Sequence, residues 1–221
     1  MPRKKRPARN ARKLDGIQIA AIIVFVAVAA VIIWMAAFNN GDEAEQVAPQ
    51  GNAKQYDSPP PMTIDPAKQY LATVKMEKGG EFVIQLYPAK APIAVNNFVF
   101  LAREGFYNGT TFHRVLEGFM AQGGDPTGTG MGGPGYEFVN EDSDLIFDKP
   151  GVAAMANAGR DTNGSQFFIT FGPAEHLNGG YTIFGQVISG METVNRLTRR
   201  DPDQNPGFAG DVIKSITITE E

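Results

Sequence analysis

The sequence predicts a mainly β domain, folded as a closed barrel capped by two α-helices and preceded by one transmembrane helix. Three observations predict it: 25 glycines and 15 prolines among 221 residues, a series of short apolar runs separated by glycines, and one long apolar run near the N-terminus. Many short strands joined by glycine-rich turns are typical of β-barrels and sandwiches. The hydrophobic content of 43% is ordinary for a chain with a packed core.

The long apolar run covers residues 17–38, where Gln18 is the only clearly polar side chain. A helix of this length, rising ~1.5 Å per residue, spans the ~30 Å hydrocarbon layer of a bilayer. A buried helix of a globular domain is the alternative, but such helices are rarely apolar on every face. Basic residues precede the run and an acidic stretch, GDEAE, follows it. The positive-inside rule then predicts a single-pass cell-membrane anchor, with a cytoplasmic tail at 1–16 and the rest of the chain outside the cytoplasm.

The anchor is expected to stay uncleaved, because the apolar run is long for a cleavable signal peptide. The following residues, 39–68, are polar and contain the sequence Pro59-Pro60-Pro61. This composition predicts a flexible linker that the prolines partly stiffen. The remaining residues, 69–221, are predicted to form one domain.

Periodicity within the domain predicts its elements in order. Alternating apolar and polar residues at 70–77 and 81–87, joined by a Lys-Gly-Gly turn, predict a β-hairpin. Apolar residues then recur at helical spacing between Pro92, which favours a helix start, and Gly105, which favours its end. Six further apolar runs predict strands, with a short helix among them: residues 111–116, 118–122, 151–156, 166–170, 181–188 and 214–219, and the helix at 191–199.

Composition excludes several kinds of function. Cysteine is absent, which excludes disulfides, thiolate nucleophiles and cysteine-bound metals. His113 and His176 are the only histidines, so a multi-histidine metal site is excluded and neither metal nor cofactor is expected. Seven of the 20 basic residues but only one of the 24 acidic residues precede the apolar run. The acidic remainder would repel phosphate, so the domain is not expected to bind nucleic acid.

Residues 128–133 match the GxGxxG pattern of dinucleotide-binding proteins. Because no βαβ unit surrounds them, a surface loop is predicted instead. No GxSxG, HExxH or Ser/His/Asp set is evident either. A catalyst with this inventory would have to work by binding and electrostatics.

Three long motifs follow one another in the domain: FHRVLEGFMAQGGD at 112–125, MANAG with NGSQFFI between 155 and 169, and LNG with FGQV between 177 and 187. Together they resemble the signatures of the cyclophilin family of peptidyl-prolyl cis/trans isomerases, in a bacterial-like form with an N-terminal membrane anchor. The resemblance covers about residue 70 to residue 219. It implies a closed eight-stranded antiparallel β-barrel capped by two α-helices, and isomerase activity on X-Pro bonds.

The resemblance also implies an active groove on the outer face of the barrel, with Arg114 as the catalytic residue. The substrate-binding positions that match the family are Phe119, Met120, Gln122, Gly128, Ala156, Asn157, Ala158, Gln166, Phe168, His176, Leu177 and Tyr181. His176 stands where many eukaryotic members have tryptophan, and Tyr181 stands where they have histidine. These departures predict altered substrate preference and weak binding of the inhibitor cyclosporin.

The implied chemistry suits these residue types. Rotation about an X-Pro amide has a barrier of ~18–20 kcal/mol because it breaks the amide conjugation. In the twisted transition state the proline nitrogen becomes a hydrogen-bond acceptor, so an arginine aimed at it binds the transition state better than the ground state. Aromatic and aliphatic side chains would hold the proline ring, while Gln122 and the Asn157 backbone would bind the peptide.

Two other functions stay open at this point. One is a catalytically idle peptide-binding module tethered to the membrane, which the presence of Arg114, Phe119 and Gln122 disfavours. The other is a membrane protein whose basic N-terminus binds anionic lipid or nucleic acid, with the domain as cargo. The expected partners are proline-containing polypeptides that have left the cytoplasm, and the membrane through residues 17–38. The catalytic domain is expected to be monomeric.

Overall fold

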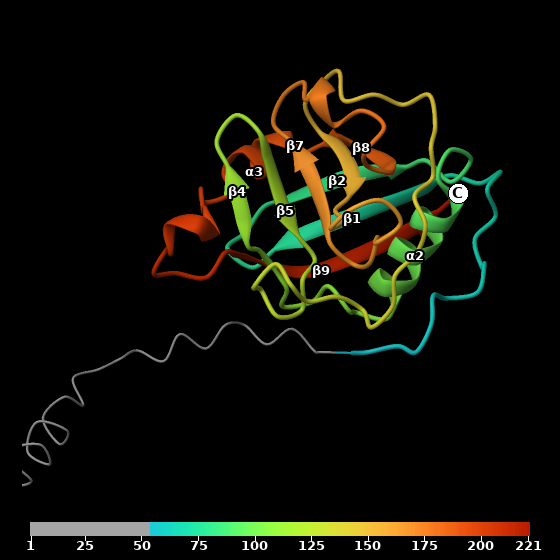
Figure 1. The fold of residues 1–221 in the computed structure, drawn as a ribbon, viewed down its shortest axis with the longest axis horizontal. Coiled ribbons are helices and arrows are strands. Elements are labelled where there is room, and N and C mark those ends of the chain that lie inside the picture. The colour runs from blue at the N-terminus through green and yellow to red at the C-terminus, as the bar shows by residue number, and fades with distance from the viewer. Residues whose placement is uncertain (1–53) are drawn as a thin grey trace, which may run out of the picture. The chain divides into compact units, whose positions relative to one another are not determined.

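The computed structural model describes residues 54–221, so the predicted tail, anchor and first part of the linker lie outside the described residues. Within residues 54–221, no helix combines the length and apolarity needed to cross a bilayer. The described chain is mainly β, as predicted (Figure 1).

One antiparallel sheet contains all the strands of the described residues. Its order is β3-β9-β1-β2-β8-β6-β7-β5-β4. The strands are β1 (Tyr70–Met76), β2 (Glu81–Leu86), β3 (Thr111–Phe112), β4 (Arg114–Leu116), β5 (Met120–Gly123), β6 (Val152–Met155), β7 (Phe167–Thr170), β8 (Ile183–Ser189) and β9 (Asp211–Glu220). The two ends of this order, β3 and β4, are neighbours in the chain, so the sheet nearly closes into a barrel.

The prediction of eight strands is corrected to nine. The predicted strand at 111–116 is interrupted at His113, which separates β3 from β4. The segment changes partners at this residue, because β3 pairs with β9 whereas β4 pairs with β5. The guanidinium of Arg200 donates to the carbonyl oxygen of His113, which therefore does not need a ladder partner.

Two α-helices occur in the described residues, on different sides of the barrel (Figure 1). Helix α2 (Pro92–Arg103) packs against β9, and its proline at the first position agrees with the predicted start. Its backbone N–H groups at Ile93 and Ala94 donate to the carboxylate of Glu141, both at 2.8 Å. A residue far away in the sequence thus caps this helix, since Ala91 at the N-cap offers no side-chain acceptor.

Helix α3 (Met191–Asn195) is shorter than the predicted 191–199. The guanidinium of Arg199 donates to the carbonyl oxygens of Asn195, at 3.1 Å, and Leu197, at 2.7 Å. A basic side chain near the C-terminus of a helix can satisfy its last carbonyls, and Arg199 does so here for Asn195. Two short 3-10 helices complete the described elements, η1 (Glu175–Leu177) and η2 (Pro202–Gln204).

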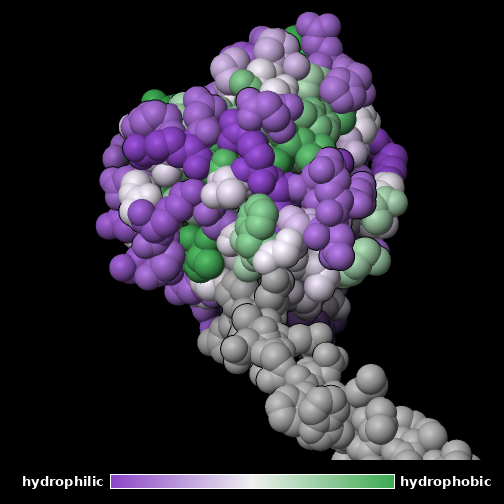
Figure 2. All heavy atoms as spheres, turned by 90° about the vertical axis from the view of Figure 1, so that its left-hand side faces the viewer, coloured by the Kyte–Doolittle hydropathy of each residue, from purple (hydrophilic) through white to green (hydrophobic). Residues whose placement is uncertain are grey.

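Two hydrophobic clusters form on opposite faces of the sheet. Phe167 and Ile169 of β7 belong to the cluster inside the barrel, whereas Phe168 between them belongs to the second cluster, outside it. The alternation follows from the strand geometry, in which successive side chains point to opposite faces. On the side drawn in Figure 2, hydrophilic residues cover most of the surface and hydrophobic residues gather in separate patches.

The described part of the predicted linker lies against the domain. Residues 54–64, called the strap below, form no helix or strand. They are held by α2, where Asn96 accepts a hydrogen bond from the Thr63 backbone at 2.9 Å and donates to the Pro61 carbonyl at 3.0 Å. Ile64 is buried in the core cluster at 6% exposure. These polar and apolar contacts replace those that a free linker would make with water, so this part of the chain is packed.

Candidate active site

The outer face of the barrel carries a row of residues across four strands. Arg114 on β4 lies opposite Gln122 on β5, Gln122 lies opposite Phe168 on β7, and Phe168 lies opposite Ala154 on β6. Directly opposed residues have Cβ atoms about 4.5–5.5 Å apart on the same face. The row therefore places a cation, an amide and an aromatic ring side by side, although their sequence positions span more than 50 residues.

A small cavity of about 190 Å³ opens over this row. The residues that line it are Arg114, Phe119, Met120, Gln122, Ala156, Asn157, Phe168, Leu177 and Tyr181. All of them are sequence-predicted site residues, brought together from four separate segments. The volume is below the ~300–1,000 Å³ typical of pockets for drug-sized ligands, and it suits one small side chain.

The apolar wall of the small cavity is fixed by ring contacts. Phe168 is 4% exposed and stacks on Phe147, with ring centroids 5.8 Å apart. The ring of Tyr181 meets Phe168 edge-on at 5.3 Å. Met120 is only 2% exposed, so the floor of the cavity is closely packed.

The polar side of the small cavity is formed by Arg114, which is half-buried. Within residues 54–221, no hydrogen bond or ion pair engages its guanidinium. An arginine carries up to five N–H donors and keeps its charge at all physiological pH values. Its donors are therefore available to a bound molecule beside an apolar wall.

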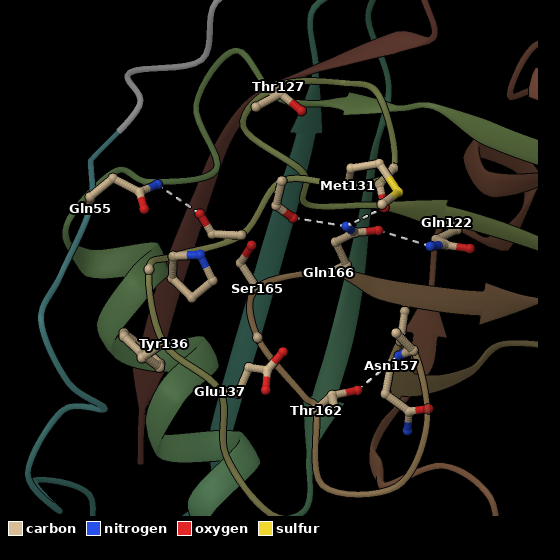
Figure 3. A pocket seen from close by; sticks show the side chains of 18 residues that line it. Gln55, Gln122, Thr127, Met131, Tyr136, Glu137, Asn157, Thr162, Ser165 and Gln166 are labelled. Carbon is tan, nitrogen blue, oxygen red and sulfur yellow. Dashed lines mark hydrogen bonds between the residues drawn. The ribbon is translucent and has the colours of Figure 1, made fainter.

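A larger cavity of about 750 Å³ adjoins the small one and shares Gln122, Ala156 and Asn157 with it. Figure 3 shows Gln122 and Gln166 pointing toward each other at the wall of the larger cavity. The Gln122 amide donates to the Gln166 side-chain oxygen at 2.9 Å, and the Gln166 amide donates to the carbonyl oxygens of Gly130 and Gly132 at 2.9 and 2.8 Å. This chain of hydrogen bonds fixes the loop that forms one wall of the larger cavity.

The same loop is organised from beneath by Asp125, which is fully buried. Its carboxylate accepts from the backbone and hydroxyl of Thr127, at 2.7 and 2.8 Å, and from the backbone of Gly132 at 3.1 Å. Burial alone would raise the pKa of Asp125, but these hydrogen bonds outweigh it and hold the pKa below its ordinary value. The carboxylate is thus a fixed anion that the loop wraps around.

The comparisons with known proteins decide the family. Residues 71–220 match the profile described as cyclophilin type peptidyl-prolyl cis-trans isomerase/CLD. The chain belongs to the cyclophilin family. It is 51% identical over 142 residues to peptidyl-prolyl cis-trans isomerase-like 1 from Homo sapiens, covering 62% of this chain and 83% of that protein. It is 46% identical over 144 residues to peptidyl-prolyl cis-trans isomerase B from Bacillus subtilis, covering 65% and 94%.

A solved structure agrees with this assignment. A cyclophilin type peptidyl-prolyl cis-trans isomerase from Cryptosporidium parvum, crystallised in the presence of the dipeptide Ala-Pro, has a TM-score of 0.62 and 37% sequence identity, covering 68% of this chain and 99% of that one. This cyclophilin is thus a peptidyl-prolyl cis-trans isomerase, as predicted. Its relatives come from bacteria and eukaryotes alike, so they do not support the finer prediction of a bacterial-like form.

The other predicted site residues of this cyclophilin lie outside the small cavity. Ala158 and Gln166 line the larger cavity. His176 is exposed and packs on the ring of Phe119, with centroids 5.5 Å apart, at the rim of the small cavity. Gly128 lines neither cavity; its backbone N–H donates to the Asp125 carbonyl at 3.2 Å, which makes it a turn residue of the loop.

Sequence reasoning missed much of the larger cavity, including the loop at 130–137, Thr162 and Gln55. The glycines at 130–133 were predicted as a surface loop only. Asp125 followed by Thr127 is an Asx-turn signal that could have marked an ordered loop. Nothing in the sequence indicates that Gln55, which precedes the family match, reaches this wall.

His113, which precedes Arg114, is buried at 2% exposure. Burial lowers its pKa, against the opposing effect of the nearby Asp125 carboxylate. A neutral imidazole beneath the loop fits the structural role predicted for it. Within residues 54–221, no group of three or more histidine or acidic side chains could hold a metal ion.

Proposed function

We propose that this cyclophilin accelerates X-Pro rotation in polypeptides outside the cytoplasm, with Arg114 as the catalytic residue of the small cavity. The observation that carries the assignment of Arg114 is its guanidinium, which has no partner among residues 54–221 and lies beside an apolar wall. A partly desolvated cation attracts a developing acceptor more strongly than one in bulk water.

The energetic requirement is modest. Uncatalysed exchange takes tens of seconds to minutes. Turnover at several hundred per second needs about 10⁴-fold acceleration, or roughly 5–6 kcal/mol. One charged donor that bonds only to the pyramidal nitrogen of the transition state, together with a fixed proline ring, is of the right size to supply this.

The residues of the small cavity would have different roles in this reaction. Phe119, Met120 and Phe168 would enclose the proline ring and exclude water, with Leu177 and Tyr181 closing the other side. Gln122, opposite Arg114, would hold the peptide group while the acyl side turns. No proton is transferred, so the rate of the chemical step should not follow the titration of any side chain.

The catalytically idle alternative predicts binding without turnover. The test is a proline isomerisation assay with the full chain in detergent and a short Xaa-Pro peptide. Catalysed exchange supports the proposal, and peptide binding without faster exchange overturns it.

The location rests on the sequence of the N-terminal region. Residues 17–38 would anchor the chain, with the basic tail inside and the isomerase domain outside. In spheroplasts, external protease should then release a fragment that contains the domain. Protection of the domain until the membrane is broken would overturn this orientation. A monomeric domain predicts that the released fragment behaves as a single chain in sedimentation.

Weak cyclosporin binding is proposed as well. His176 offers a smaller ring than tryptophan, and it already packs on Phe119. A tight complex measured by titration would contradict this part of the proposal.

A further inference from the structure

The strap, residues 54–64, reaches the wall of the larger cavity. Gln55 is one of the residues that line this cavity, and Figure 3 shows it at the edge opposite Gln122. The strap precedes residues 71–220, the part that matches the family model, so this contact lies outside the matched part.

An aromatic cluster anchors the strap at Tyr56. Its ring lies edge-on to Phe100 of α2, with centroids 5.1 Å apart, and to Tyr136 of the loop at 6.4 Å. Phe106 completes the cluster at 6.5 Å. Aromatic pairs at these distances add to the stability gained from burial. Tyr56 thus joins the helix and the loop, beside the direct hydrogen bond that the Tyr136 hydroxyl of the loop donates to Asn97 of α2.

Two hydrogen bonds tie the strap to the loop itself. The Tyr56 backbone N–H donates to the Pro134 carbonyl at 2.8 Å. The Gln55 side-chain amide donates to the Gly133 carbonyl at 2.9 Å. Since the Gln166 amide binds the carbonyls of Gly130 and Gly132, the loop is held from the groove side by Gln166 and from the outer side by the strap.

The fit between strap and loop leaves no room at Gly135. A Cβ atom there would lie 2.7 Å from the Tyr56 carbonyl oxygen and 2.9 Å from the Gln55 side-chain oxygen. The φ angle of Gly135 is +97°, which other residues rarely adopt. The loop therefore carries a glycine at a position where the strap crosses it closely.

We propose that the strap is a specificity-determining element, in which Gln55 and Tyr56 are positioning residues. They fix the loop at 130–137 and so set the width of the larger cavity. The polypeptide residues that flank the isomerised proline enter this cavity, which makes the strap selective for extended chains over short peptides. This inference rests on the proposed function of the small cavity, because the flanking residues are placed only when the proline is bound there.

The test compares two substrates with the full chain and its variants. One substrate is a short Xaa-Pro peptide, which occupies only the small cavity, and the other is an unfolded protein whose refolding is limited by a proline. For Gln55→Ala/Tyr56→Ala, KM on the unfolded protein should rise about tenfold, which equals about 1.4 kcal/mol of binding. The kcat on both substrates and the KM on the short peptide should stay within about twofold.

A second variant and a control keep the test decisive. Gly135→Ala disturbs the same contact from the loop side and should give the same split between substrates. Gln55→Ala, which leaves the aromatic cluster intact, should raise KM on the unfolded protein about threefold and leave KM on the short peptide unchanged. Met62→Ala changes an exposed residue of the same strap, at 52% exposure, and should leave kcat and KM unchanged on both substrates.

The outcomes separate the inference from the proposed function. An equal loss of kcat/KM on both substrates, or no change of kcat/KM on either, overturns the proposed role of the strap. If the unaltered chain does not accelerate exchange in the short peptide, the proposed function is wrong instead. Melting temperatures of all variants show whether a loss on both substrates comes from unfolding.

Discussion

Arg114 lies directly opposite Gln122 in the antiparallel pair of β4 and β5, and both side chains line the small cavity. Gln122 in turn donates to Gln166, which holds the loop of the larger cavity. One short ladder pair thus joins the proposed catalytic cation to the larger cavity, the proposed site for the flanking polypeptide. A change in the position of β4 or β5 would therefore move both the cation and the loop of the larger cavity.

Replacing Arg114 by lysine should lower kcat/KM on a short peptide by about tenfold or more. Lysine keeps the charge but loses the planar set of donors and its reach into the cavity. The fold should persist, because no hydrogen bond or ion pair of the described residues depends on this side chain. Arg103→Lys, at the end of α2, is the matched control and should leave kcat/KM on the short peptide unchanged. Near-normal turnover in the Arg114 variant would remove Arg114 from the central role.

The larger cavity should prefer a basic flanking residue. Among the described residues that line it, Glu137 alone is charged, and it is exposed. Exposed ion pairs contribute about 0–1 kcal/mol, so Glu137→Lys should lower kcat/KM two- to fivefold for substrates with a flanking lysine. Substrates with a flanking alanine should not respond, and high salt should abolish the difference. Glu192→Lys, on α3, controls for the change in net charge; an identical effect from it would refute the site.

The Glu141 cap should matter for stability. Glu141→Ala removes the acceptors of two α2 backbone N–H groups, at Ile93 and Ala94, which should cost about 1–3 kcal/mol of unfolding free energy in denaturant titrations. A loss below a few tenths of a kcal/mol would show that water satisfies these groups. Thr63→Ala is the comparison: it truncates another side chain that contacts α2, through Asn96, without removing the Glu141 acceptors. The two losses of unfolding free energy can then be compared.

The same residue predicts a pH dependence. Burial raises the pKa of Glu141, against the hydrogen bonds from Ile93 and Ala94. The folded state therefore binds this proton more readily than the unfolded state does. The contribution of Glu141 is largest below the ordinary glutamate pKa of ~4.3 and is lost as the pH rises through the raised value. Relative to Glu141→Gln, the native chain should lose stability over that interval; a gain would contradict the raised pKa.

Cyclosporin affinity should respond to His176→Trp. A tryptophan in place of the exposed imidazole on Phe119 would bury on the order of 50–100 Å² more apolar surface, or about 1–2.5 kcal/mol at ~25 cal/mol/Å². Inhibition should strengthen between about tenfold and nearly a hundredfold. Turnover should change little, because His176 does not line the small cavity. An unchanged inhibition constant would show that His176 does not determine the affinity for cyclosporin.

Local patterns in the sequence determined most of the barrel. The alternation at 70–77 and 81–87 became β1 and β2, and the helical spacing after Pro92 became α2. These predictions were confirmed because the spacing of apolar residues along neighbouring positions follows the period of a strand or a helix. The residues of the small cavity were predicted by the resemblance of three motifs to the family, and the register of β4 and β5 places Arg114 opposite Gln122.

Only the tertiary structure decided the features that join distant segments. The interruption at His113 depends on Arg200, the cap of α2 depends on Glu141, and the wall of the larger cavity depends on Gln55. Each of these contacts joins residues that are tens of positions apart and follow no shared period. The sequence by itself therefore determined the elements and the candidate site residues, while long-range packing decided where strands change partner and where the strap lies.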